Sequence, residues 1–158
     1  MTLRYLTPLT ADEQLAHGLD APQTLAIADR VRFAELDVQE HVNNKAYMGW
    51  FETLRIAYVD TICAPHFGGV RPRILLHSVH LRYVQEMLRD EDYIATARVA
   101  GFRQNSFTLD QQLWSGTLRA RMTAVIVLGQ PEGDDRFALP ESLKAQFLTL
   151  DRAIDESA

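Results

Sequence analysis

The chain has 158 residues, 47% of them hydrophobic and 23% charged, which is typical of one soluble globular domain spanning residues 1–158. The formal net charge of −5 argues against nucleic acid or an anionic membrane surface as partners. Because Cys63 is the only cysteine, an intrachain disulfide is excluded, and no zinc site is expected.

The amino terminus lacks the apolar core of a signal peptide. No run of about eighteen apolar residues occurs, so no membrane-spanning helix is expected. These features, together with the single cysteine, predict a cytoplasmic protein.

Two elements are predicted in the first 34 residues. Thr10 and Glu13 have the spacing of a capping box, which predicts a short helix that ends near Gly18. From Thr24 to Ala34 apolar residues alternate with polar ones, which predicts a strand. A loop from Glu35 to Asn43 should follow it.

A long helix is predicted from Asn44, whose side chain suits the N-cap position. Apolar residues recur at helical spacing and extend beyond one stripe, which indicates a helix covered on most of its sides. Glu52 and Arg55 are expected to form a local ion pair on it. Cys63, near its end, is expected to be a small buried hydrophobe.

Four more alternating segments, at residues 78–83, 93–99, 107–113 and 119–128, predict strands joined by short turns in an antiparallel meander. Pro140 is expected to begin a closing helix. The order of strand, long helix and four strands is satisfied by an α+β fold, in which an antiparallel sheet of about five strands wraps around the central helix. An open edge strand would favour pairing between chains.

The segment before the long helix concentrates polar side chains. It places the carboxylate of Asp37, the imidazole of His41 and the amides of Asn43 and Asn44 within eight residues. The start of a helix carries unpaired N–H groups and a partial positive charge that can hold an oxyanion. A nearby carboxylate can activate water or attack directly, so the combination suits acyl transfer.

This segment, with Val31-Arg-Phe-Ala-Glu-Leu before it and Tyr47 and Trp50-Phe-Glu-Thr-Leu-Arg55 after it, resembles the hotdog-fold acyl thioesterases. The similarity is to the 4-hydroxybenzoyl-CoA thioesterase-like group and to the acyl-ACP thioesterases. The resemblance implies a hotdog fold, a homodimer with active sites at the subunit interface, and hydrolysis of an acyl thioester. A homotetramer remains open, because hotdog dimers pair in several ways.

The resemblance also assigns roles. Asp37 matches the acidic residue that serves as base or nucleophile, and His41 matches a histidine that follows it, with holding the loop as its alternative role. Asn43 and Asn44 match the paired amides before the helix. Gln39 stands where the acyl-ACP branch has asparagine, which favours coenzyme A as the carrier. The residues expected to bind substrate are Asn43, Asn44, Tyr47, Trp50 and Phe51, of which the three aromatic residues have the hydrophobic core as their alternative.

We therefore expect an acyl-CoA thioesterase that hydrolyses an acyl or aryl-acyl thioester without a metal or other cofactor, with Asp37 and His41 as catalytic residues. Two alternatives stay open. One is an acyl-ACP thioesterase, and the other is a non-catalytic module that binds acyl thioesters or serves in assembly. A catalytic role for Glu52 on the helix is also left open.

Overall fold

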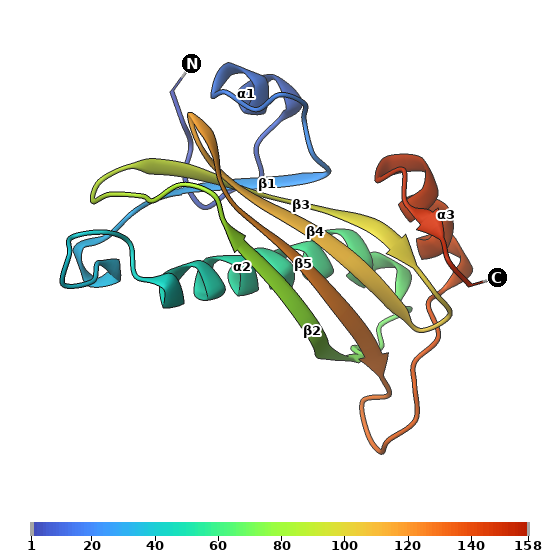
Figure 1. Ribbon diagram of the computed structural model, residues 1–158. Helices are drawn as coiled ribbons and strands as arrows, with labels where there is room; N and C mark the ends of the chain where they lie inside the picture. Colours follow the sequence, from blue (N-terminus) through green and yellow to red (C-terminus); the bar gives the residue numbers. More distant parts are fainter. Residues whose placement is uncertain (1, 158) are drawn as a thin grey trace.

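The computed structural model describes residues 2–157, in which an antiparallel sheet wraps around one long helix (Figure 1). The helices are α1 (Ala11–Ala16), α2 (Asn44–Tyr58) and α3 (Glu141–Leu150). The strands are β1 (Leu25–Arg30), β2 (Arg73–Tyr83), β3 (Asp92–Phe102), β4 (Ser106–Ser115), β5 (Thr117–Gly129) and β6 (Ile154–Asp155). This arrangement confirms the predicted α+β hotdog architecture. No helix in the described range is long and apolar enough to cross a membrane.

Helix α2 lies along the concave face of the sheet and forms the centre of the core (Figure 1). Phe51, Leu54 and Tyr58 are at most 2% exposed and belong to the same buried cluster as the sheet residues Leu109 and Met122. Burying each such side chain contributes roughly 1.5–3 kcal/mol. The apolar surface of α2 beyond one stripe is therefore explained by a sheet that curls around it.

The end of α2 is irregular. The helix continues through a π-helical turn, Val59–Cys63, and a 3-10 turn, Ala64–His66, before Gly68 and Gly69 turn the chain with φ values of 63° and 83°. Cys63 is fully buried, as predicted. Burial, and secondarily the charge of Asp151, raises the pKa of its thiol, so it stays protonated.

The predicted meander is correct for three strands and wrong for the fourth. Strands β3, β4 and β5 follow one another, but β2 pairs with β5, giving the order β1-β3-β4-β5-β2, with β6 parallel to β3. The alternation of apolar and polar residues determines which face of the sheet a side chain occupies, but it does not determine which strand pairs with which. Strand β2 also begins at Arg73, ahead of its predicted start, because a bulge between Leu76 and Ser78 interrupts the alternation.

The first strand is shorter than predicted. β1 ends at Arg30, and the chain then forms a 3-10 turn at Phe33–Glu35.

The capping box predicted at the start of α1 is confirmed, since Thr10 Oγ1 accepts from the Glu13 N–H and the Glu13 carboxylate accepts from the Thr10 N–H. Helix α1 lies on the sheet face opposite to α2 (Figure 1).

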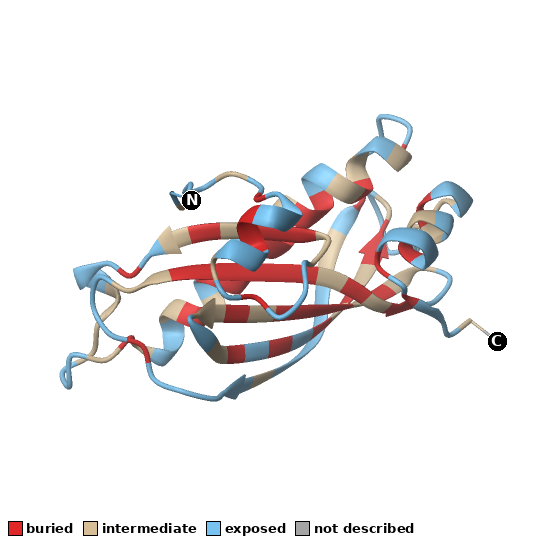
Figure 2. Ribbon diagram, turned by 90° about the horizontal axis from the view of Figure 1, so that it is seen from above, coloured by how far each residue is buried: buried red, intermediate tan, exposed pale blue. Residues whose placement is uncertain are grey.

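The two outer edges of the sheet differ. At β1, the amino-terminal segment covers the edge, because the Leu6 N–H donates to Ala28 O and the Leu9 N–H to Ala26 O, both at 2.9 Å. At the other edge, the eleven residues of β2 include none that is buried, whereas most of β3 is buried (Figure 2). Within the described residues, β2 therefore presents the free edge.

The carboxyl-terminal segment is fixed to the core by Asp151, which is 3% exposed. Its carboxylate accepts hydrogen bonds from the Tyr58 hydroxyl and the Val99 N–H, both at 2.5 Å, and from the Thr24 hydroxyl at 2.7 Å. Burial, followed by the charge of Asp151, raises the pKa of Tyr58, so the phenol remains a donor. Asp151 thus joins the end of α3 to α2 and β3.

Candidate active site

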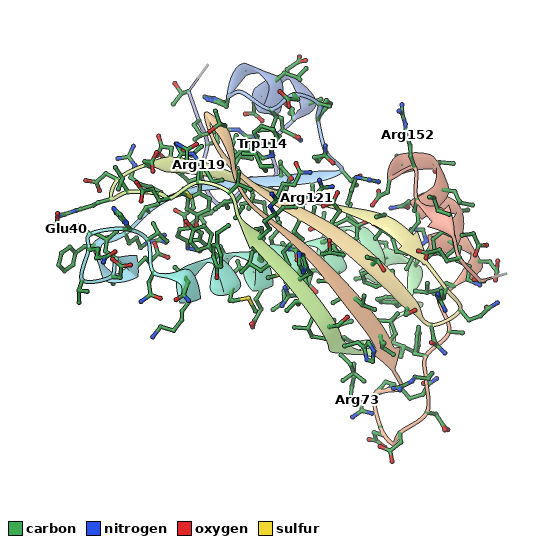
Figure 3. All side chains as sticks on the ribbon, in the orientation of Figure 1. Glu40, Arg73, Trp114, Arg119, Arg121 and Arg152 are labelled. Atoms are coloured by element: carbon green, nitrogen blue, oxygen red, sulfur yellow. The ribbon has the colours of Figure 1, made fainter. Side chains whose placement is uncertain are left out.

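The loop that carries Asp37 is closed by its own backbone. The Asp37 N–H donates to His41 O at 2.8 Å, and Glu40, at φ 63°, turns the chain at the exposed tip of the loop (Figure 3). Asp37 Oδ1 accepts from the N–H groups of Gln39, at 2.8 Å, and His41, at 3.2 Å. Within residues 2–157, Asp37 Oδ2 has no hydrogen-bond partner. One carboxylate oxygen is therefore held by two N–H groups, and the other is left without a partner in the described part of the chain.

The same loop is anchored to the rest of the fold. The Val42 N–H donates to Met87 O at 2.9 Å and the Asn43 N–H donates to Glu35 O at 2.7 Å. Glu35 also accepts from Trp50 Nε1 at 2.5 Å. These contacts tie the loop to the segment after β2 and to α2, so the position of Asp37 relative to the helix is fixed.

The N-cap of α2 is Asn43, so its assignment to Asn44 from the sequence was wrong by one residue. Asn43 has an extended backbone, and its Oδ1 accepts from the Lys45 N–H at 2.9 Å. Both asparagines suit a cap, and only the backbone decides between them. Asn44 is the first helical residue, and its N–H has no acceptor in the described part of the chain. That donor is available to a ligand.

Replacing Asn43 by alanine should lower the free energy of unfolding by about 0.5–2 kcal/mol, because the Lys45 N–H loses its acceptor. Asn44→Ala is the matched control and should change it by less than about 0.5 kcal/mol, since the exposed Asn44 side chain caps nothing. Urea denaturation of both variants measures this difference. Equal losses would contradict the cap assignment.

His41 contacts an acidic residue that the sequence did not indicate. Its Nδ1 lies 3.1 Å from Glu86 Oε2. This contact is an ion pair when the imidazole is protonated. No hydrogen bond joins the imidazole to the carboxylate of Asp37 among residues 2–157. The backbone of His41, rather than its ring, positions Asp37.

Five of the predicted residues border one depression of about 500 Å³ at the start of α2. They are Asp37, His41, Asn43, Asn44 and Tyr47, and Tyr83 and Glu86 join them from β2 and the segment after it. A second depression, of about 690 Å³, lies on the other side of the loop and is bordered by Asp37, His41 and Arg89. Asp37 is thus accessible from both sides.

Tyr47 and Tyr83 form the aromatic wall of the 500 Å³ depression. Their rings meet edge to face with centroids 5.1 Å apart, and the Tyr83 hydroxyl donates to Asn44 O at 3.1 Å. Burial raises the pKa of Tyr47 to about 12, so its hydroxyl is neutral and can donate at ordinary pH. Glu86 is not predictable from the sequence, because the irregular segment that carries it gives no signal of a distant helix start.

The two remaining predicted residues lie elsewhere. Trp50 borders a separate cleft of about 540 Å³ between α2 and β1, where it stacks on Tyr93 at 4.4 Å. Phe51 is fully buried against the sheet and borders neither depression next to Asp37. For Phe51 the structure therefore shows the core position that the sequence left as its alternative.

The predicted ion pair between Glu52 and Arg55 is wrong. Arg55 is 7% exposed and turns inward, with Nη1 3.4 Å from Gln111 Oε1 and 3.6 Å from Met122 Sδ.

Among residues 2–157, no group of three or more His, Cys, Asp or Glu side chains is placed to hold a metal ion.

Comparison with known proteins identifies related sequences and structures. The family model described as thioesterase-like superfamily matches residues 31–147. A thioesterase-superfamily structure from Jannaschia sp. CCS1 is 37% identical, with a TM-score of 0.89, and the match covers 99% of this chain and 100% of that one. No curated protein matches the chain.

More distant structures share the fold. A thioesterase from Thermus thermophilus, crystallised with coenzyme A and zinc, is 22% identical with a TM-score of 0.66, over 80% of this chain and 93% of that one. YbaW, a probable thioesterase from Escherichia coli, is 18% identical with a TM-score of 0.69, over 80% and 98% of the two chains.

Proposed function

Since the chain belongs to the thioesterase-like superfamily, we propose that it is an acyl-CoA thioesterase, hydrolysing an acyl or aryl-acyl thioester to the free acid and coenzyme A. The observation that carries this proposal is the geometry of Asp37. One of its carboxylate oxygens is held by two N–H groups, and the other is free beside the start of α2. That is the arrangement required of a base or nucleophile at an acyl carbon.

The chemistry follows from these groups. The thioester carbonyl oxygen would lie against the free N–H of Asn44, where the partial positive charge of the helix start stabilises developing negative charge. Asp37 takes a proton from water as the water oxygen bonds to the acyl carbon, and the carbon–sulfur bond then breaks. The proton passes to the departing thiolate. In the alternative route Asp37 attacks first, and water opens the mixed anhydride that forms.

Labelled water tests for the anhydride route. After a single turnover in H₂¹⁸O, label in the Asp37 carboxylate shows that water attacked the anhydride at the aspartyl carbon, and the bridging Asp37 oxygen then leaves unlabelled in the product acid. Attack at the acyl carbon of the anhydride instead labels the product acid and leaves Asp37 unlabelled. Direct attack by water places one labelled oxygen in the product of the first turnover.

Coenzyme A is proposed as the carrier, in preference to acyl carrier protein. The net charge of −5 gives no long-range attraction for an acidic carrier protein, and Arg89, beside Asp37 in the 690 Å³ depression, can meet phosphate. The Thermus thermophilus relative, crystallised with coenzyme A, supports this choice. The test is hydrolysis of one acyl group on both carriers. Faster turnover of the carrier-protein thioester would favour the acyl-ACP alternative.

The proposed active form is a homodimer joined along β2. Leu76, Val79 and Tyr83 pair with core residues of β5 and so face the concave side, yet they are 45%, 40% and 49% exposed. A free edge of eleven residues with an apolar inner face is suited to pairing with a second copy. A stable interface would bury more than about 1,000 Å² in total.

Val79→Lys should convert the dimer to a monomer, because it places a charge on the apolar inner face of β2. His80→Lys, on the opposite face of the same strand, is the matched control and should remain dimeric. Light scattering should give twice 17.9 kDa for the wild type and the control. A wild-type mass of 17.9 kDa with full activity would contradict the proposed dimer.

His41→Ala is expected to lower kcat/KM by about tenfold or less, because the backbone groups that position Asp37 remain. Glu86→Gln, which removes the charge facing Nδ1, should have a similar or smaller effect. Steady-state kinetics on one acyl-CoA measures both. A loss in His41→Ala as large as in Asp37→Asn would instead make the imidazole part of one catalytic unit.

A further inference from the structure

Arg55 is a buried cation with no carboxylate within salt-bridge distance, although the charge of Glu52 on the same helix acts on it from farther away. Its two contacts are neutral, namely the Gln111 amide oxygen and the Met122 sulfur. Gln111 is itself fully buried, and its amide nitrogen donates to Phe51 O at 2.8 Å, which aims the amide oxygen at Arg55. In the described part of the chain, no acidic oxygen lies within 4.0 Å of the guanidinium. Burying a guanidinium with so few acceptors is unfavourable unless another group completes its environment.

Arg55 borders a cavity of about 340 Å³ between α2, β2 and β5. Its walls are apolar, formed by Ile56, Val59, Ile74 and Ile126. Two other charged residues border it, Glu52 and Arg71, and both are exposed. Arg71 is paired with Asp60 at 2.7 Å, so Arg55 is the buried, unpaired charge of this cavity. A concave apolar space with one inward polar group has the form of a ligand subsite.

The location of the cavity follows from the directions of α2 and β2. Tyr83, at the end of β2, contacts Asn44 at the start of α2, whereas Ile74, near the start of β2, borders the cavity with Arg55. The two elements therefore run antiparallel, and Arg55 lies about 16 Å along α2 from Asn44.

A dimer joined two-fold along β2 would bring this cavity close to the second active site. Antiparallel pairing of β2 with its own copy places the end of one β2 beside the start of the other. The Asp37 loop of one protomer then lies near the Arg55 cavity of its partner. An acyl group whose thioester meets Asp37 in one protomer would extend toward Arg55 in the other.

We propose that Arg55 determines substrate specificity by binding a carboxylate at the far end of the acyl group, so that the preferred substrates are carboxy-terminated acyl thioesters. This inference rests on the proposed thioesterase function and dimer. A carboxylate matches the planar guanidinium with two charge-assisted hydrogen bonds and compensates its buried charge. The apolar walls accommodate the methylene groups that precede it.

Glu52 is the one unpaired acidic residue at this cavity among the described residues, and it would repel a carboxylate. It is exposed and solvated, whereas Arg55 is 7% exposed, so the attraction acts in the drier surroundings and is the stronger effect. Glu52→Gln is therefore expected to leave the preference for a carboxy-terminated group unchanged or to increase it.

The experiment compares glutaryl-CoA with valeryl-CoA, which have the same chain length and differ in the terminal carboxylate. Wild type is expected to favour glutaryl-CoA by about tenfold or more in kcat/KM, the effect of a charge-assisted contact. Arg55→Met should abolish that preference and keep valeryl-CoA hydrolysis within about threefold. It should fold, because a buried charge replaced by an apolar side chain of similar length is often tolerated. Arg55→Gln is the second variant, and thermal melts verify both.

Binding of the two thioesters, measured by titration calorimetry on Asp37→Asn with and without Arg55→Met, separates this inference from the proposed function. If wild type hydrolyses neither thioester but binds glutaryl-CoA tighter through Arg55, the catalytic proposal fails and the subsite stands. The subsite proposal is overturned if wild type shows no preference for glutaryl-CoA, or if Arg55→Met weakens both substrates equally. It is also overturned if Arg55→Met abolishes the dimer, which would make Arg55 a partner of the second subunit.

Discussion

Asp37→Asn is expected to lower kcat/KM for acyl-CoA hydrolysis by about 10²–10⁴-fold, the cost of removing a positioned base. The amide keeps an oxygen that can accept from the Gln39 and His41 N–H groups, so the loop should retain its shape. What is lost is the negative charge and basicity of the free oxygen. Steady-state kinetics and a thermal melt of the same sample measure the two properties separately.

Glu40→Gln is the matched control for this prediction. Glu40 lies in the same loop and carries the same charge, but its side chain is exposed at the tip and points away from the helix start (Figure 3). Its activity should stay within about twofold of wild type. An Asp37→Asn variant that keeps more than about a third of wild-type activity would refute the role of Asp37.

Asp151→Ala should have the largest effect on stability, lowering the free energy of unfolding by about 3 kcal/mol or more. The substitution leaves three buried donors without an acceptor, the hydroxyls of Tyr58 and Thr24 and the N–H of Val99. For a chain of this size that corresponds to a decrease in Tm of roughly 6–12 °C.

The control for Asp151 is Asp134→Ala, an exposed aspartate in the loop before α3, which should change the unfolding free energy by less than about 0.5 kcal/mol. Asp151→Asn, which retains the shape and one acceptor oxygen, should lie between the two. A Tm for Asp151→Ala within about 2 °C of wild type, the effect of roughly 1 kcal/mol or less, would show that the three donors find other partners.

Local sequence patterns predict where the helices and strands lie, but they do not predict which strands pair. The capping box at Thr10, the apolar periodicity of α2 and the buried Cys63 were all readable, because each depends on residues close in sequence. The pairing of β2 with β5 was not, since it requires the chain to pass around α2. The misplaced N-cap shows the same limit, because adjacent asparagines differ only in their backbone angles.

Only those residues of the candidate site that precede or begin α2 could be predicted from the sequence. Asp37, His41 and the two asparagines are close in sequence and precede the same helix, so they border one depression at its start. Glu86 reaches the site from the segment that follows β2, and no local pattern marks it. Arg55 was predicted to pair with Glu52, because a charge three residues after Glu52 has the spacing of an ion pair, and only the fold turns it inward.

Whether this protein breaks acyl-CoA thioesters is the question on which the other proposals depend. The most direct measurement is a single-turnover assay with enzyme in excess over each of a panel of acyl-CoA substrates, with release of the free thiol followed in time. We expect stoichiometric release of coenzyme A from at least one substrate, and a rate for Asp37→Asn lower by about 10²-fold or more. Tight binding of acyl-CoA by the wild type, with the thioester intact across the panel, would contradict the proposed hydrolysis and identify a non-catalytic acyl-thioester binding module.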